Sequence, residues 1–317
     1  MNPMLTANDL FEAQQTPLKL RWLAGHSGRD RLLEPATARF PGLALVGYLN
    51  FVHPNRVQVL GAGEVDYLRR LPPAEHVQAI QKLFTCPTTT LVVVAHDEAV
   101  DPDLVQAADA AGLPLLATPL AGPKVIGHLQ HYLTRALAVR TTLHGVFLEV
   151  MGVGVLITGE SGIGKSEVAL ELLSRGHRLI ADDAVEFSRT APDVLIGRCP
   201  SMLCDFLEVR GLGILNVRAM FGDTAVRKEK TLRLIVHLEQ LRKEQMSKID
   251  RLQAEQKTTS ILDVDIPEVV LYAAPGRNLA VLVEAATRSH ILRMRGVNPL
   301  QELIQRQQAS MTGEDKS

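Results

Sequence analysis

Eight consecutive residues, 159–166, have the types and the spacing of a phosphate-binding loop. They read Gly-Glu-Ser-Gly-Ile-Gly-Lys-Ser and match the pattern G-x-x-x-x-G-K-[ST] at every fixed position. Because glycine has no Cβ, such a loop can curl until its backbone N–H groups surround an anion at the positive end of a helix dipole. Lys165 would then neutralise the β- and γ-phosphates of a nucleotide, and the Ser166 hydroxyl would bind Mg²⁺. The predicted nucleotide-binding residues are Gly159, Glu160, Ser161, Gly162, Ile163, Gly164, Lys165 and Ser166.

Two adjacent carboxylates, Asp182 and Asp183, end the strand predicted at 178–181. The carboxyl end of a strand in a parallel α/β sheet is where side chains meet a ligand. One carboxylate could hold Mg²⁺ or its water ligands, and the other could accept the proton of an attacking hydroxyl group. Since strand-end carboxylates are often only caps of the next turn, it is the neighbouring phosphate loop that favours a functional role.

The elements that must position these residues are predicted from hydrophobic periodicity. Two β-type runs joined at 151–153 indicate a hairpin whose second strand leads into the loop. A helix is predicted from Ser166, and Gly176 is placed to end it. The charged segment 242–259 has no apolar stripe, so we expect an exposed, mobile loop there. The two hairpin strands are predicted at 146–150 and 154–158, and further strands at 206–209, 231–238 and 269–272. A helical tail is predicted at 278–307 and disorder at 311–317.

The first 130 residues alternate short β-type runs with helical patterns, which predicts an α/β layer. With 317 residues, the chain exceeds the usual size of one hydrophobic core. A long helix predicted over 123–142 contains the expected domain boundary near residue 131. The predicted fold class is α/β: an N-terminal α/β domain (1–131), regulatory or concerned with assembly, and a C-terminal P-loop kinase domain (132–317) with a mostly β core flanked by helices. The N-terminal strands are predicted at 43–49, 57–60, 91–95 and 113–117, and the helices at 64–71, 74–84 and 102–111.

Composition argues against several partners. The sequence has 34 Lys and Arg and 35 Asp and Glu, which gives a net charge of −1. Such a charge creates no overall electrostatic field that would attract nucleic acid or an anionic membrane. No signal peptide is recognised, and glycines and Glu149 interrupt the most apolar stretch, 146–158, so no membrane span is expected. Cys86, Cys199 and Cys204 are odd in number and lack Cys-x-x-Cys spacing, which indicates reduced thiols. We therefore expect a cytoplasmic protein that binds neither nucleic acid nor membrane.

With these residues in view, the chain resembles HPr kinase/phosphorylase, a bacterial family that acts on a serine of the phosphocarrier protein HPr. The resemblance is closest over 144–186, which contains the loop and the two carboxylates. It continues in 207–217, where Leu-Glu-Val-Arg-Gly-Leu-Gly-Ile-Leu-Asn-Val is similar to the family signature, and in 250–252 and 275–279. The specific resemblance covers 132–300, and the N-terminal part matches in length and α/β character only.

The resemblance, carried over residue by residue, implies specific roles. It makes Asp183 the acid/base catalyst, and it makes Asn216 the end of a stretch important to both reaction directions. The stretch 272–277 matches one important for dephosphorylation, although Ala274 stands where the family has a basic residue before proline, which bears on the efficiency of phosphorolysis. The implied catalytic residues are His144, Lys165, Asp183, Arg251 and Arg277, and the implied metal ligands are Ser166 and Glu208.

The implied activity is bifunctional and requires Mg²⁺. ATP or pyrophosphate would phosphorylate a serine of HPr, and inorganic phosphate would remove that phosphoryl group as pyrophosphate. The family also implies a homohexamer. Because an ordinary Asp, with a pKa of about 3.9, is a poor acid at neutral pH, we expect Asp182 and partial burial to raise the pKa of Asp183, with His144 adjusting it.

Two other classes of function stay open. A small-molecule or carboxykinase-like P-loop phosphotransferase would share the loop, and absence of phosphate transfer from labelled ATP to HPr would favour it. A non-enzymatic nucleotide-sensing regulator would keep its output in the Asp183→Asn variant, whereas a kinase would lose turnover. The loop itself does not identify a protein serine as substrate, so that inference depends on the resemblance.

Overall fold

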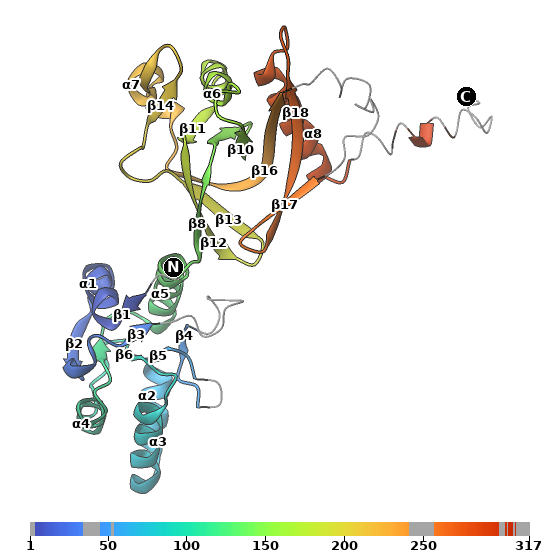
Figure 1. The fold of residues 1–317 in the computed structure, drawn as a ribbon. Coiled ribbons are helices and arrows are strands. Elements are labelled where there is room, and N and C mark those ends of the chain that lie inside the picture. Colours follow the sequence, from blue (N-terminus) through green and yellow to red (C-terminus); the bar gives the residue numbers. More distant parts are fainter. Residues whose placement is uncertain are drawn as a thin grey trace. The chain divides into compact units, whose positions relative to one another are not determined.

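The computed structural model describes residues 4–33, 45–51, 54–240 and 257–297, together with 302, 304–306 and 308. The chain divides into two compact units (Figure 1). The first comprises Met1–Val139 together with Thr190–Pro192, and the second comprises Arg140–Arg189 and Asp193–Ser317. The boundary expected near residue 131 lies inside helix α5 (Gly122–Ala136), which packs on strands of the first unit.

The first unit is a five-stranded sheet, counted over the described residues, with helices on both faces. Two of its strands, Val57–Leu60 and Leu91–Val94, are buried at every position, as expected for parallel strands covered on both sides. One apolar cluster joins the sheet to α1 (Ala7–Leu18) and α5, and another joins it to α2 (Ala62–Arg70), α3 (Pro73–Thr85) and α4 (Pro102–Ala111). The strand order is β2 (Arg21–Ala24), β7 (Leu115–Ala117), β6 (Leu91–Val94), β5 (Val57–Leu60) and β4 (Val46–Tyr48). Only β2 is antiparallel to its neighbour. A separate two-stranded sheet is formed by β1 (Leu5–Thr6) and β3 (Leu32–Leu33).

Most elements predicted in this unit are confirmed. The four strands and three helices correspond to β4 to β7 and to α2, α3 and α4. Helix α1 was not predicted, although it begins with a capping box in which Thr6 and Asp9 exchange hydrogen bonds between side chain and backbone. That four-residue pattern is a signal in the sequence that could have located the helix.

The second unit has a mostly β core, as expected. Its nine-stranded sheet, counted over the described residues, depends on one long strand, β16 (Glu229–Gln240). The first part of β16 pairs with β13 (Val194–Arg198), and the second part pairs in parallel with β10 (Val153–Gly159) and β18 (Val264–Ala273). The remaining strands are β9 (Val146–Val150) and β11 (Arg178–Ala181) beyond β10, β12 (Ala184–Ala191) and β8 (Arg140–His144) beyond β13, and β17 (Lys257–Ile261) beside β18.

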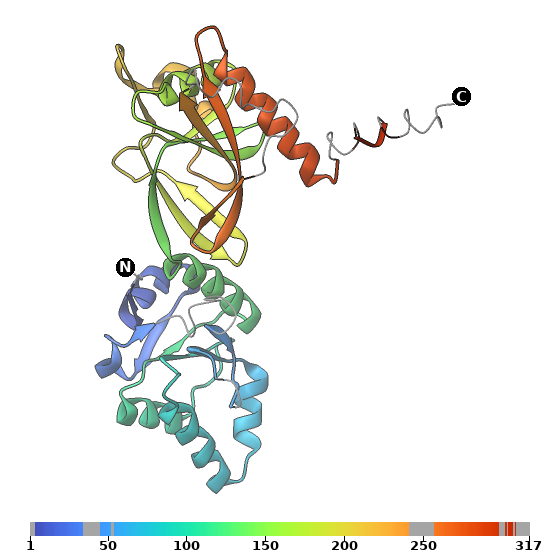
Figure 2. The ribbon, with the colours of Figure 1, turned by 45° about the vertical axis from the view of Figure 1, so that its right-hand side comes forward.

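Helices cover this core from the outside. Helix α8 (Leu279–Met294) runs along β16 and β18 and also contacts α6 (Lys165–Ser174) (Figure 2). Arg175, which follows α6, donates two hydrogen bonds of 2.9 and 2.7 Å to the Glu284 carboxylate of α8. A hairpin of β14 (Phe206–Val209) and β15 (Gly213–Asn216) packs with α7 (Val217–Phe221) beside α6. No helix among the described residues has both the length and the apolar character needed to cross a membrane.

The hairpin predicted in this unit is confirmed, and the helix predicted to lead into the unit is wrong at its C-terminal end. β9 and β10 form the expected hairpin, with positive φ at Met151 and Gly152, the combination that a two-residue hairpin turn requires. The helix predicted over 123–142 ends at Ala136 instead, because Arg-Thr-Thr-Leu-His alternates in exposure and is rich in β-branched threonine, which suits strand β8. Of the predicted loop 242–259, residues up to 256 lie outside the described residues, as does the tail 311–317, while 257–259 belong to β17.

Candidate active site

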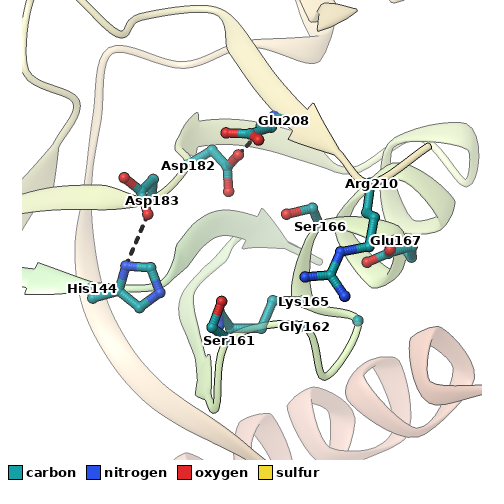
Figure 3. A pocket seen from close by; sticks show the side chains of 11 residues that line it. His144, Ser161, Gly162, Lys165, Ser166, Glu167, Asp182, Asp183, Glu208 and Arg210 are labelled. Atoms are coloured by element: carbon teal, nitrogen blue, oxygen red, sulfur yellow. Dashed lines mark hydrogen bonds and ion pairs between the residues drawn. The ribbon is translucent and has the colours of Figure 1, made fainter. Parts of the chain in front are cut away.

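The predicted phosphate loop joins the end of β10 to the start of α6, as its sequence pattern requires (Figure 3). Gly159 ends the strand with a φ of +143°, and a Cβ built there would lie 2.5 Å from the carbonyl oxygen of Leu238 on β16. Gly164 precedes the helix with a φ of +103°, in the left-handed region. Only glycine meets both requirements without strain, so these two positions follow from the local geometry.

Lys165 is held inside the curl of this loop. Its Nζ donates hydrogen bonds of 2.9 and 3.1 Å to the carbonyl oxygens of Gly159 and Glu160, and the residue is buried. Of the predicted loop residues, five line a pocket on one side: Ser161, Gly162, Gly164, Lys165 and Ser166. Glu160 and Ile163 line a second hollow on the other side, together with Ser161 and Gly162.

The carboxylates reach the first pocket by a route that differs from the expected parallel sheet. β11 is antiparallel to β9, and β9 is antiparallel to β10. Two reversals give β11 the same direction as β10, so the ends of both strands lie at one edge of the sheet. Asp182 and Asp183 therefore line the pocket together with the phosphate loop, although the sheet is mixed.

Asp182 is buried and holds the neighbouring hairpin. It is 8% exposed, and its Oδ2 accepts a hydrogen bond of 2.9 Å from the backbone N–H of Glu208 on β14. Burial raises the pKa of Asp182, and the charges of Asp183 and Glu208 raise it further, while the backbone N–H groups of Glu208 and Asp183 act in the opposite direction. The Glu208 side chain is exposed and lines the pocket.

Asp183 is paired with His144. The Nδ1 atom of His144 lies 2.9 Å from Asp183 Oδ1, and Figure 3 shows the two side chains facing each other. These side chains are 58% and 71% exposed. The expectation of a partly buried Asp183 is therefore wrong. The burial that raises a carboxyl pKa is found at its neighbour Asp182, while Asp183 stands exposed in a left-handed turn with a φ of +64°.

Two lining residues were not predicted as site residues, Glu167 and Arg210. The Arg210 guanidinium lies beside Gly162, where a Cβ built on the glycine would be 3.1 Å from its Nη1. Arg210 directly follows β14, two residues after the proposed metal ligand Glu208, so its place in the signature could have indicated that it reaches the same site.

The structure does not bring every predicted residue into this pocket. Arg277 lines a separate hollow with Tyr272 and Asn278. Residues 273–275 line the second hollow, against the far side of the phosphate loop. Arg251 lies outside the described residues.

The donor atoms fit a magnesium nucleotide. The hydroxyl of Ser166 and the carboxylates of Glu208 and Asp182 are hard oxygen donors of the kind that Mg²⁺ prefers, and Mg²⁺ usually binds through only one or two carboxylates, water and phosphates. Lys165 and Arg210 supply positive charge for a polyphosphate. The site thus combines an anion loop, a set of cation ligands and an exposed carboxylate that can move a proton.

The chain is similar in sequence to known proteins over most of its length. Residues 135–307 match the family model described as HPr Serine kinase C-terminal domain, and residues 5–133 match HPr Serine kinase N terminus. A protein named HPr kinase/phosphorylase from Xylella fastidiosa (strain M12) is 50% identical over 96% of this chain and 97% of its own length. One of the same name from Stenotrophomonas maltophilia (strain K279a) is 52% identical over the same shares. A solved structure of the Hpr(Ser) kinase/phosphatase from Coxiella burnetii is 38% identical, with a TM-score of 0.46, and covers 49% of this chain and 93% of that one.

Proposed function

The chain belongs to the HPr serine kinase family, and on this premise we propose that it is a bifunctional HPr kinase/phosphorylase. In one direction the γ-phosphoryl group of ATP, or a phosphoryl group of pyrophosphate, is transferred to a serine hydroxyl of HPr. In the other direction inorganic phosphate attacks the phosphorus of phosphoseryl-HPr, which yields pyrophosphate and the free serine.

The observation that carries this proposal is the position of the His144–Asp183 pair. It lines the same pocket as the phosphate loop, yet both side chains are more than half exposed. A serine on the surface of another protein needs a catalytic carboxylate that it can reach from outside. The arrangement therefore favours a protein substrate over a small molecule enclosed in a cleft.

In the kinase direction, the loop and Lys165 hold the polyphosphate, and Asp183 accepts the serine proton as the new O–P bond forms. His144 contacts Oδ1 of Asp183, so Oδ2 remains for the serine hydroxyl. General base catalysis of this kind contributes about 10²–10⁴-fold to a rate. Alignment and charge neutralisation supply most of the rest in phosphoryl transfer.

Magnesium would be held by Ser166 and Glu208. When bound, Mg²⁺ neutralises charge that develops on the polyphosphate. Asp182 supports this arrangement without touching the reacting atoms, because it fixes the backbone of the strand that presents Glu208.

In the phosphorylase direction, the same carboxyl group returns its proton to the serine oxygen as the O–P bond breaks. The exposed Arg210 guanidinium beside Gly162 is placed to stabilise negative charge on the phosphoryl group in transit. Arg251 and Arg277 stay proposed catalytic residues on the strength of the family resemblance.

We also propose that the protein works in the cytoplasm as a homohexamer, with domain 1–131 serving in regulation or assembly. Cys86, Cys199 and Cys204 are free thiols, which suits a reducing compartment. Sedimentation of the purified protein tests the hexamer directly, and loss of the hexamer on removal of 1–131 would assign assembly to that domain.

The decisive experiment incubates the protein with HPr, Mg²⁺ and ATP, detects phosphoserine by mass spectrometry, then removes ATP, adds phosphate and measures pyrophosphate. Asp183→Asn should lower both rates by about 10²–10⁴-fold and keep nucleotide affinity. Asp193→Asn, an exposed carboxylate between β12 and β13, is the matched control and should be fully active. Phosphoserine formation at the wild-type rate by Asp183→Asn would refute the proposed role.

A further inference from the structure

Three side chains of metal-ligand type converge in the first unit, and the mechanism uses none of them. His76 belongs to α3, and Asp101 and Asp103 lie at the start of α4. Each offers one ligand atom, and the three atoms lie within 4.8 Å of one another. Within the described part of the chain this is the one His, Cys, Asp and Glu group with that property.

A hydrogen bond outside the group determines which ring nitrogen faces the carboxylates. His76 Nδ1 lies 2.8 Å from the carbonyl oxygen of Leu68, near the end of α2. A carbonyl only accepts, so Nδ1 carries a proton and the neutral ring has its lone pair on Nε2. That Nε2 lies 3.3 Å from Asp101 Oδ2 and 3.7 Å from Asp103 Oδ2. In the neutral ring, three electron-rich atoms therefore face one another, an arrangement that a cation between them would stabilise.

The distances distinguish a proton from a metal ion. A proton on Nε2 would draw a carboxylate into a charge-assisted hydrogen bond of about 2.7–2.9 Å, and both observed distances are longer. Ligands about 2.0–2.2 Å from a tetrahedral Zn²⁺ ion lie roughly 3.3–3.6 Å from each other. The separation of 3.3 Å lies within that range, and the separation of 3.7 Å lies just above it.

The ligands are also oriented as metal ligands usually are. A ligating histidine typically donates its other ring N–H to a backbone carbonyl, as His76 does to Leu68. The second oxygen of Asp101, Oδ1, accepts a hydrogen bond of 2.9 Å from the Asp103 backbone N–H, which fixes that carboxylate. The His76 and Asp101 side chains are 13% and 27% exposed, whereas Asp103 is 54% exposed and leaves a path for entry.

We propose that His76, Asp101 and Asp103 bind a divalent transition-metal ion, with Zn²⁺ as the fitting ion and water as the fourth ligand. An imidazole with two carboxylates suits Zn²⁺, while Mg²⁺ prefers octahedral oxygen ligands. The ion would clamp α3 to α4, two helices that already pack together. This site would stabilise the first unit and is independent of phosphoryl transfer.

The test titrates Zn²⁺ into the full-length protein against a chromogenic chelator, with Mg²⁺ and a non-hydrolysable nucleotide saturating the phosphate-loop pocket. Wild type should bind one more Zn²⁺ ion than Asp103→Asn, or should bind the same ion at least about 100-fold more tightly. Loss of a residue that only hydrogen-bonds to a metal ligand already lowers affinity by about 10–100-fold, so loss of a ligand should cost at least as much. Asp103 is half-exposed, and only its backbone N–H takes part in the N-terminal cap of α4, where it donates to Asp101 Oδ1. The variant should therefore fold normally. Glu75→Gln, exposed in the first turn of α3, is the matched control and should bind as wild type does.

Crystals grown with Zn²⁺ locate the ion by anomalous scattering at the zinc edge. A peak among the three side chains in wild type, absent in Asp103→Asn, is the expected result. Equal Zn²⁺ binding by wild type and Asp103→Asn, or a wild-type peak elsewhere with none at His76, would overturn the proposal and leave the group as a plain ion pair.

Discussion

His144 and Asp183 are joined twice, once through their side chains and once through the backbone beside them. The ion pair of 2.9 Å is accompanied by a hydrogen bond of 3.1 Å from Gly145 N to the carbonyl oxygen of Asp183. In the ladder between β8 and β12, His144 stands opposite Ala184, the residue that follows Asp183. Strand register, rather than burial, therefore sets the contact of this exposed pair.

Replacing the imidazole should lower turnover and leave the fold intact. In His144→Gln the strand pairing persists because it uses backbone atoms, while the group that orients Asp183 is lost. We expect kcat to fall by about 10²-fold in both directions, the lower end for acid/base groups, with nucleotide affinity unchanged. His131→Gln, on the exposed side of α5, should match wild type. An unchanged kcat in His144→Gln would contradict an orienting role.

Asp182 should make stability depend on pH in the sense opposite to an ion-paired aspartate. Its pKa is raised in the folded state from 3.8, with burial as the largest cause. The folded protein then holds this proton more tightly than the unfolded chain, so stability falls as pH rises from 3.8 to the raised value and is constant above it. Asp182→Asn keeps an oxygen that can accept from Glu208 N but does not titrate.

The free energy of unfolding of Asp182→Asn minus that of wild type should therefore grow as pH rises through this window. Urea unfolding from about pH 3.5 to 7 measures the difference. The exposed Asp193→Asn should show no such change relative to wild type. A flat difference for Asp182→Asn would mean that its carboxyl group titrates alike in both states.

A methyl group at Gly159 should damage the nucleotide site through the backbone. Its Cβ would collide with the Leu238 carbonyl of β16, and its φ of +143° is unfavourable for alanine. We expect Gly159→Ala to lose about 1–3 kcal/mol of stability and to bind nucleotide poorly. Gly127→Ala in α5 meets open space and should gain about 0.5–1 kcal/mol. Thermal unfolding and nucleotide titration measure both; a Gly159→Ala protein with wild-type affinity would contradict the geometry.

A buried carboxylate on β9 should be a sensitive point of the second unit. Glu149 lies 3.0 Å from Arg178, 2.7 Å from Arg227 and 2.8 Å from Lys230. Burial alone would raise its pKa, but the hydrogen bond from Lys230 and the three positive charges lower it overall. The ionised Glu149 carboxylate therefore contributes to the stability of the folded protein. This contribution is fully present above the ordinary glutamate pKa of 4.5 and is lost as pH falls through the lowered pKa.

Glu149→Gln should cost about 3 kcal/mol at neutral pH, because three cations lose their counter-charge at a buried position. Glu186→Gln removes a half-buried partner of Arg198 and should cost less than about 1 kcal/mol. Chemical unfolding of both variants measures the contrast. Equal losses would show that the burial of Glu149 has no energetic consequence.

Local chemistry made part of this structure predictable. The loop pattern at 159–166 and the turn at Met151-Gly152 each depend on a few neighbouring residues, and both appear where expected. The strands β8, β12 and β13 were not predicted. They alternate in burial without a run of fully buried residues, and β8 and β13 each also pair with a segment that is distant in the sequence. The contacts of His144 and Arg210 depend on that pairing and on the packing of the β14–β15 hairpin, neither of which local periodicity contains.

The position of β8 has a consequence for how the site would come apart. It ends the order of the large sheet and, over the described residues, pairs with β12 alone. Such an outer strand frays before the interior of a sheet opens, and His144 is its last residue. When β8 peels away, the carboxylate loses its imidazole while the nucleotide loop, anchored on interior strand β10, keeps its shape.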